Sequence, residues 1–150
     1  MGGAGCGKTT LAAFLEEDSF SIRKTPHMVY RTYTLDTPAS YLESPWMRQH
    51  LIAAAQDASC VLMLTDAAAA RMIYPPGFAK VFRVPVFGIV TRCQKCAQEN
   101  IRAAEIQLKQ AGIKEPFYYI DFTDDACIKT DLYKLRQRLE PYRKLAEIMF

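Results

Sequence analysis

The chain has 150 residues, which is typical of one domain with a hydrophobic core of its own. Half of its residues are apolar and 23% are charged, and the formal net charge of +3 is too small to indicate binding to nucleic acid. No apolar stretch approaches the roughly 18 residues that a membrane-spanning helix needs, and five cysteines without a disulfide-like spacing favour a reducing cytoplasm, so we expect a cytoplasmic protein with no membrane or nucleic-acid partner.

The first ten residues, Met-Gly-Gly-Ala-Gly-Cys-Gly-Lys-Thr-Thr, fit the phosphate-binding pattern G-x-x-x-x-G-K-[ST]. Glycines suit such a loop because its backbone turns in ways that a Cβ forbids while its amides point at phosphate oxygens. Lys8 is the predicted catalytic residue, since its ammonium would reach the β- and γ-phosphates, and the Thr9 hydroxyl would bind Mg²⁺. The predicted nucleotide-binding residues of this loop are Gly2, Gly5, Cys6, Gly7, Lys8, Thr9 and Thr10.

A helix is predicted over Leu11 to Glu17, so that its N-terminus faces the phosphates. A phosphate loop normally follows a buried strand that is central in the sheet, yet this loop begins at Met1. We expect that the first strand is missing or that the chain folds around a gap. The missing strand is the favoured alternative, with Met1 in the place of its last apolar residue.

Residues 28–35 are predicted to form a strand or a tight strand pair that ends at Asp36. The Asp36 carboxylate would then stand at the carboxyl edge of the sheet, where ligands of α/β proteins bind. An aspartate before a turn is often only a cap or turn residue. Its position after the phosphate loop favours a second Mg²⁺ group, which holds the metal directly or through water.

The remaining segments alternate between strand and helix patterns. We predict strands over Cys60 to Leu64, Val84 to Val90 and, as the last strand, Phe117 to Phe122. Helices are predicted over Trp46 to Gln56, with Ser44 as its cap, and over Gln98 to Ala111. A final helix carries Ile128, Leu132, Leu135 and Leu139, and Pro141 interrupts it before a second helical turn over Tyr142 to Phe150. This alternation predicts one α/β domain, residues 1–150, with a doubly wound, mostly parallel sheet and helices on both faces.

Four segments together narrow the family: the phosphate loop through Leu11, then Arg23-Lys24-Thr25, Asp36-Thr37-Pro38 and Ser44-Pro45-Trp46. They resemble the EutP/PduV family of small GTPase-like P-loop proteins, which are linked to bacterial microcompartments for ethanolamine and propanediol utilisation. The likeness covers nearly the whole chain. It implies a Ras-like P-loop NTPase fold, Mg²⁺ with ATP or GTP as cofactors, and microcompartment shell proteins as candidate partners.

The resemblance also implies that Thr25 is a switch-like metal ligand beside Thr9 and Asp36, although an exposed loop hydroxyl explains Thr25 equally well. Guanine recognition in such proteins uses Asn/Thr-Lys-x-Asp, and here the segment reads Thr91-Arg92-Cys93-Gln94. Thr91 and Arg92 are therefore predicted to bind nucleotide, with Arg92 lying along the base. Gln94 lacks the two carboxylate oxygens that accept the protons of guanine, so the base is left open between adenine and guanine.

Two further departures bear on turnover. Ala39 replaces the glycine of Asp-x-x-Gly, and Ser40 stands where a glutamine would orient the attacking water, which indicates slow hydrolysis. Three functions remain open: Mg²⁺-dependent nucleotide binding with slow hydrolysis that controls a partner, phosphoryl transfer to a small acid such as acetate as the family implies, or a degenerate non-catalytic scaffold. The lone Cys93-x-x-Cys96 spacing is interpreted as chance, since no second pair accompanies it.

Overall fold

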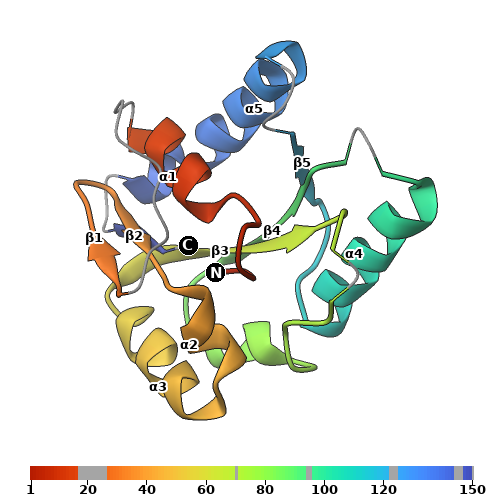
Figure 1. Ribbon diagram of the computed structural model, residues 1–150. Coiled ribbons are helices and arrows are strands. Elements are labelled where there is room, and N and C mark those ends of the chain that lie inside the picture. The colour runs from red at the N-terminus through yellow and green to blue at the C-terminus, as the bar shows by residue number, and fades with distance from the viewer. Residues whose placement is uncertain (17–26, 70, 94–95, 122–124, 144–146, 150) are drawn as a thin grey trace.

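The computed structural model describes residues 1–16, 27–69, 71–93, 96–121, 125–143 and 147–149 (Figure 1). Its helices are α1 (Lys8–Glu16), α2 (Ala39–Glu43), α3 (Pro45–Ala54), α4 (Gln98–Gln110) and α5 (Asp125–Arg143), with a short 3₁₀ turn at Phe78–Val81. Its strands are β1 (Val29–Tyr30), β2 (Thr34–Asp36), β3 (Ala58–Asp66), β4 (Val86–Thr91), β5 (Tyr118–Ile120) and β6 (Glu147–Met149). The six strands form one sheet in the order β1-β2-β6-β3-β4-β5.

Only the β1–β2 pair is antiparallel among these strands, and the other neighbours run parallel. The β1–β2 hairpin is the tight strand pair that the sequence predicts before Asp36. β3 is buried along almost its whole length, as expected for a parallel strand that is covered on both faces. This strand is the backbone of the hydrophobic core.

The side chains of β3 alternate between two hydrophobic clusters. Val61 and Met63 face the cluster that includes Leu51 of α3 and Leu108 of α4. The opposite face is covered by α1 and α5, whose core leucines pack against Cys60, Leu62 and Leu64 of β3. Figure 1 shows α1 and α5 on one side of the sheet and α2, α3 and α4 on the other. The predicted doubly wound arrangement is confirmed.

The central position beside β3 is occupied by two segments from opposite ends of the chain. β6 pairs in parallel with both β2 and β3, and Met149 lies opposite Leu35 and Val61. Further along β3, Leu64 donates its N–H to Met1 O at 2.7 Å, and Gly2 forms a parallel bridge with Leu64. Met1 therefore takes the place predicted for it, whereas the expectation of an open gap is wrong because β6 fills the rest of the position.

The C-terminal elements differ from the sequence prediction in two ways. The strand over 117–122 is not the last one, since residues 147–149 form β6 and not a second helical turn. Pro141 does not interrupt the preceding helix either, because α5 continues to Arg143 and Pro141 lies in its last turn. Pairing with β2 and β3 satisfies the backbone groups of residues 147–149, which outweighs their helix-like pattern.

The other helices differ less from the prediction. The segment after Asp36 forms a separate short helix, α2, before α3 begins. In α4, Ala104 and Leu108 make the contact with the core, and Ile106 is 53% exposed. Gly112 follows this helix with φ 96°, the left-handed conformation that commonly ends a helix. Within the described part of the chain, no helix is both long and apolar enough to cross a membrane.

Candidate nucleotide-binding site

The phosphate loop, residues 2–7, connects the central position of the sheet to the N-terminus of α1. Gly5 and Gly7 have φ values of 73° and 89°, in the left-handed region that glycine adopts without steric cost. At Gly2 the reason for glycine is close packing, because an added Cβ would lie 2.5 Å from Cys6 Sγ and 2.9 Å from Leu64 O. The three glycines thus meet two structural requirements, a left-handed backbone at Gly5 and Gly7 and close packing at Gly2.

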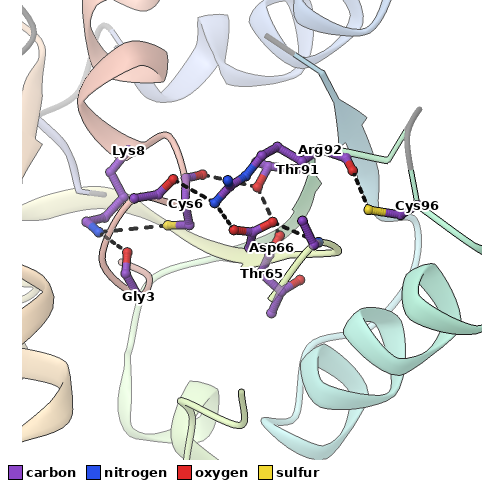
Figure 2. A network of polar contacts seen from close by, with 10 residues as sticks. Gly3, Cys6, Lys8, Thr65, Asp66, Thr91, Arg92 and Cys96 are labelled. Atoms are coloured by element: carbon purple, nitrogen blue, oxygen red, sulfur yellow. Dashed lines mark hydrogen bonds and ion pairs between the residues drawn. The ribbon is translucent and has the colours of Figure 1, made fainter. Parts of the chain in front are cut away.

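The carbonyl oxygens of the loop are held by three side chains, one from the start of α1 and two from the end of β4 (Figure 2). Lys8 Nζ donates to Gly2 O at 2.7 Å and to Gly3 O at 2.8 Å. Thr91 Oγ1 donates to Cys6 O at 3.1 Å, and Arg92 donates to Gly5 O at 3.0 Å. With the carbonyls held in this way, the loop backbone and the N-terminus of α1 form the arrangement of amides that favours anions.

Lys8 is buried, and its ammonium contributes first to the shape of the loop. Besides the two carbonyls, Nζ lies 3.8 Å from Cys6 Sγ. The Cys6 side chain is buried and belongs to the hydrophobic cluster under α1. The action of Lys8 on phosphate oxygens stays a prediction, as does the contact of Thr10, which is half-buried in the first turn of α1.

Thr9 and Asp36 are brought together as predicted. Thr9 Oγ1 donates to Asp36 Oδ2 at 2.7 Å, from the first turn of α1 to the last residue of β2. Asp36 is fully buried. A hydroxyl and a carboxylate are hard oxygen ligands that suit Mg²⁺, which takes few protein ligands and keeps waters or phosphates for the rest. The predicted third ligand, Thr25, lies outside the described residues.

Thr91 is the last residue of β4, and Arg92 follows it directly. Thr91 is fully buried, and its hydroxyl also contacts Thr65 O at 3.2 Å. Arg92 has φ 57° and forms an ion pair with Asp66, the last residue of β3. Both predicted residues therefore contact the phosphate loop directly, whereas Gln94 lies outside the described residues.

Asp66 is the residue of this site that sequence reasoning missed. The predicted strand stopped at Leu64, so Asp66 was not placed at the carboxyl edge of the sheet beside Asp36 and Thr91. The available signal was a polar Thr65-Asp66 pair directly after an apolar run, which is the usual end of a buried parallel strand.

A pocket of about 150 Å³ lies between the phosphate loop and α4. Gly3 and Ala4 of the loop form one wall, and Ala104 of α4 and the segment after β3 form the others. Gln107 is buried and holds that segment in place: its Nε2 donates to Arg71 O at 3.1 Å, and its Oε1 accepts from Ile73 N at 3.3 Å. These hydrogen bonds fix one wall of the pocket, which lies beside the phosphate loop.

Burial makes two of the cysteines, Cys93 after β4 and Cys60 in β3, poor nucleophiles. Burial, with a smaller effect from Asp121, raises the pKa of the Cys93 thiol to about 12. Burial likewise raises the pKa of Cys60 to about 12. Within the described ranges no group of three or more His, Cys, Asp or Glu residues is arranged to hold a metal ion.

A phosphate loop at the N-terminus of α1, an acid at the end of a nearby strand and a doubly wound sheet define the P-loop NTPase fold. The sequence model of the PduV-EutP family, described as "Ethanolamine utilisation - propanediol utilisation", matches residues 1–140. A propanediol utilization protein PduV from Citrobacter freundii is 31% identical over 118 residues, which are 79% of each chain. The chain belongs to the PduV-EutP family, which is tied to propanediol and ethanolamine utilisation, and the predicted resemblance is confirmed.

Proposed function

We propose that this protein binds a nucleoside triphosphate together with Mg²⁺ and hydrolyses it slowly. The observation that carries the proposal is the 2.7 Å hydrogen bond between Thr9 Oγ1 and Asp36 Oδ2 at the mouth of the phosphate loop. It joins the hydroxyl and the carboxylate of a P-loop metal site across 27 positions of sequence. Neither residue alone distinguishes such a site from an ordinary turn.

The roles of the residues follow from their positions. The loop amides and the N-terminus of α1 bind the phosphate oxygens, and Lys8 offsets the charge of the terminal phosphates. Thr9 and Asp36 would hold Mg²⁺, which supplies charge neutralisation between the β- and γ-phosphates when bound. Thr25 is the proposed third ligand.

Slow turnover is expected because the segment after Asp36 offers no glutamine to orient water. Ser40 takes that place, within the short helix α2. Unassisted hydrolysis in small P-loop GTPases proceeds on the order of 10⁻⁴ to 10⁻³ per second, and we expect a rate in this range or below it. A partner would then respond to the nucleotide-bound protein rather than to the product of hydrolysis.

The family points to the context of this activity. We infer a cytoplasmic role in the use of ethanolamine or propanediol, with shell proteins of a bacterial microcompartment as the candidate partner. The nucleotide is ATP or GTP. We expect the affinities for the two to differ by about tenfold or less, since Gln94 stands where a guanine-reading aspartate is expected. A hundredfold preference for GTP would show that another residue reads the base.

Calorimetry with Mg-ATP and Mg-GTP tests the proposal. We expect binding by the wild-type chain, loss of binding when EDTA removes Mg²⁺, and loss of binding in Lys8→Ala. Lys114→Ala, at an exposed lysine after α4, is the matched control and should bind like wild type. Unchanged affinity in a folded Lys8→Ala variant contradicts the proposed role of Lys8. If the wild-type chain binds neither nucleotide, the proposal is wrong and the non-catalytic scaffold is the remaining function.

The pocket beside Gly3 and Ala4 favours a second candidate, phosphoryl transfer to a small carboxylic acid. A cavity of about 150 Å³ holds one molecule of roughly six heavy atoms. A carboxylate oxygen there would attack the γ-phosphorus, the bond to the β–γ bridging oxygen would break, and the nucleoside diphosphate would leave with the electron pair.

Phosphorus NMR after addition of acetate separates the two candidates, because transfer produces an acyl phosphate in place of inorganic phosphate. Ala103→Leu places a larger side chain at the exposed edge of the pocket. It should abolish transfer and leave nucleotide binding unchanged. Equal release of inorganic phosphate with and without acetate leaves hydrolysis as the activity.

A further inference from the structure

We propose that Asp66 is a positioning residue of the nucleotide site, which acts through Arg92 to hold the phosphate loop in its binding conformation. The proposal rests on the proposed binding of a nucleoside triphosphate. Two described acids lie at the carboxyl edge of the sheet near the loop. Asp36 belongs to the expected metal site, whereas Asp66 contacts Arg92, which holds the loop.

The contacts form a chain from β3 to the loop (Figure 2). A single guanidinium nitrogen of Arg92 donates to Gly5 O at 3.0 Å and forms the ion pair with Asp66 Oδ2. The other carboxylate oxygen, Asp66 Oδ1, accepts from Ala68 N at 2.9 Å. The Asp66 side chain is 6% exposed and that of Arg92 is 45% exposed, so the carboxylate is the buried end of the pair.

The backbone of Arg92 adopts a conformation that the surrounding contacts must maintain. Its φ of 57° lies in the left-handed region, which costs free energy for a residue with a Cβ. Arg92 N donates to Ile120 O at 3.2 Å, and Cys96 Sγ contacts Arg92 O at 3.0 Å. This conformation lets the side chain turn back to the loop, where Asp66 and Gly5 hold its end.

Holding Gly5 O also orients an amide of the loop. The peptide unit between Gly5 and Cys6 is planar and trans, so Cys6 N–H points away from the Gly5 oxygen. That N–H is directed into the loop, 3.5 Å from Gly3 O, at the limit of a hydrogen bond. A phosphate oxygen would replace this weak acceptor. Asp66 thus prepares a phosphate-binding amide without touching the nucleotide.

Asp66→Asn is the main variant because it keeps the size of the side chain and one oxygen. That oxygen can serve either Ala68 N or Arg92, but not both, and the new amide hydrogens repel the guanidinium. We expect about tenfold weaker binding of both Mg-ATP and Mg-GTP, which is about 1.4 kcal/mol. Arg92→Met should weaken binding equally, whereas Arg92→Lys, whose ammonium has three donors, should retain affinity within about threefold.

The double variant decides whether Asp66 acts through Arg92. In the Arg92→Met background, Asp66→Asn should cause no further loss, because the contact that it breaks is already gone. Glu115→Gln is the control, since it makes the same acid-to-amide change in the separate ion pair Lys109–Glu115. Thermal melts check that each variant is folded. Arg92→Met, at the half-exposed end of the pair, carries the test if Asp66→Asn does not fold.

The outcomes separate this inference from the function on which it rests. A wild-type chain that binds neither nucleotide overturns both proposals. A wild-type chain that binds while Asp66→Asn binds equally tightly overturns the positioning role alone. The same conclusion follows if Asp66→Asn weakens binding as much in the Arg92→Met background as in wild type, or if the loss is confined to one of the two bases.

Discussion

At the scale of single residues, the phosphate loop shows that its glycines and its polar anchors have different origins. Gly5 and Gly7 meet a local backbone requirement, which the sequence motif records. Gly2 meets a packing requirement against Leu64 of β3. Thr91 and Arg92 come from a strand far along the chain and hold the loop's carbonyls from outside. The glycines can be predicted from the spacing of the motif, whereas the contacts of Thr91 and Arg92 depend on how the strands are ordered.

Gly2→Ala tests the packing requirement. The added Cβ would meet Cys6 Sγ at 2.5 Å and Leu64 O at 2.9 Å, and we expect a loss of about 1–3 kcal/mol in the free energy of unfolding. Gly3→Ala is the matched control, because its Cβ would lie 3.6 Å from Ile73, an ordinary contact. Urea denaturation measures both variants. Equal stability of the two would show that the loop can shift away from β3.

The pKa of Cys93 leads to a prediction on thiol reactivity. Burial raises this pKa from an ordinary value of 9.0 to about 12, so that the thiolate fraction at pH 8 is much smaller than in an unfolded chain. We expect iodoacetamide to modify Cys93 at least tenfold more slowly in the folded protein than in urea. Peptide mass spectrometry measures both rates. Fast modification of the folded protein would contradict the burial of this thiol.

At the scale of elements, β6 is the most consequential feature of the fold. Residues 147–149 lie outside the segment that the family model matches, yet they sit between β2 and β3 in the sheet. Ile148 packs on the α1–α5 face and Met149 on the opposite face. β6 thus joins β2, which ends at Asp36, to β3, which ends at Asp66.

Ile148→Ala tests the place of β6 in the core. Ile148 is buried, and its truncation should lower the free energy of unfolding by about 2–5 kcal/mol. Ile106→Ala is the control, because Ile106 is largely exposed on α4 and its truncation should cost well under 1 kcal/mol. Urea or thermal unfolding compares the two variants. A stability loss in Ile148→Ala no larger than in Ile106→Ala would show that β6 does not occupy the sheet in solution.

At the scale of the whole molecule, the site draws on elements from most of the chain. The loop and α1 come from the first 16 residues, Asp36 from β2, Asp66 from β3 and Arg92 from the end of β4. Parallel strands place their carboxyl ends at one edge, which gathers these residues around the N-terminus of α1. Ligand binding at such an edge should therefore stabilise the domain as a unit.

A thermal shift assay measures that coupling. At a nucleotide concentration a hundredfold above Kd, binding adds about 2.7 kcal/mol to the stability of the folded state. For a domain of this length, that raises Tm by roughly 5–10 °C. Addition of EDTA should remove most of the shift, because Thr9 and Asp36 are placed to act through Mg²⁺. A shift that is unchanged by EDTA would contradict the proposed metal site.

The sequence by itself determined the phosphate loop, the helix after it and the placement of Asp36 at a strand end. These features rest on local requirements: glycines at left-handed positions, a helix start after them, and an apolar run that stops at an acid. The family likewise was readable, since its motifs lie in short segments. The alternation of strands and helices was sufficient to predict the doubly wound sheet, because each element has its own period.

Only the tertiary structure decided which segment fills the central position and which acid anchors Arg92. Residues 142–150 have an apolar pattern that fits a helical turn by itself, and only the unpaired groups of β2 and β3 favour a strand there. Asp66 and Arg92 are 26 positions apart, and their pairing depends on the register of β3 against β4, in which Asp66 lies opposite Thr91. Register is a relation between strands, so no pattern within either strand contains it.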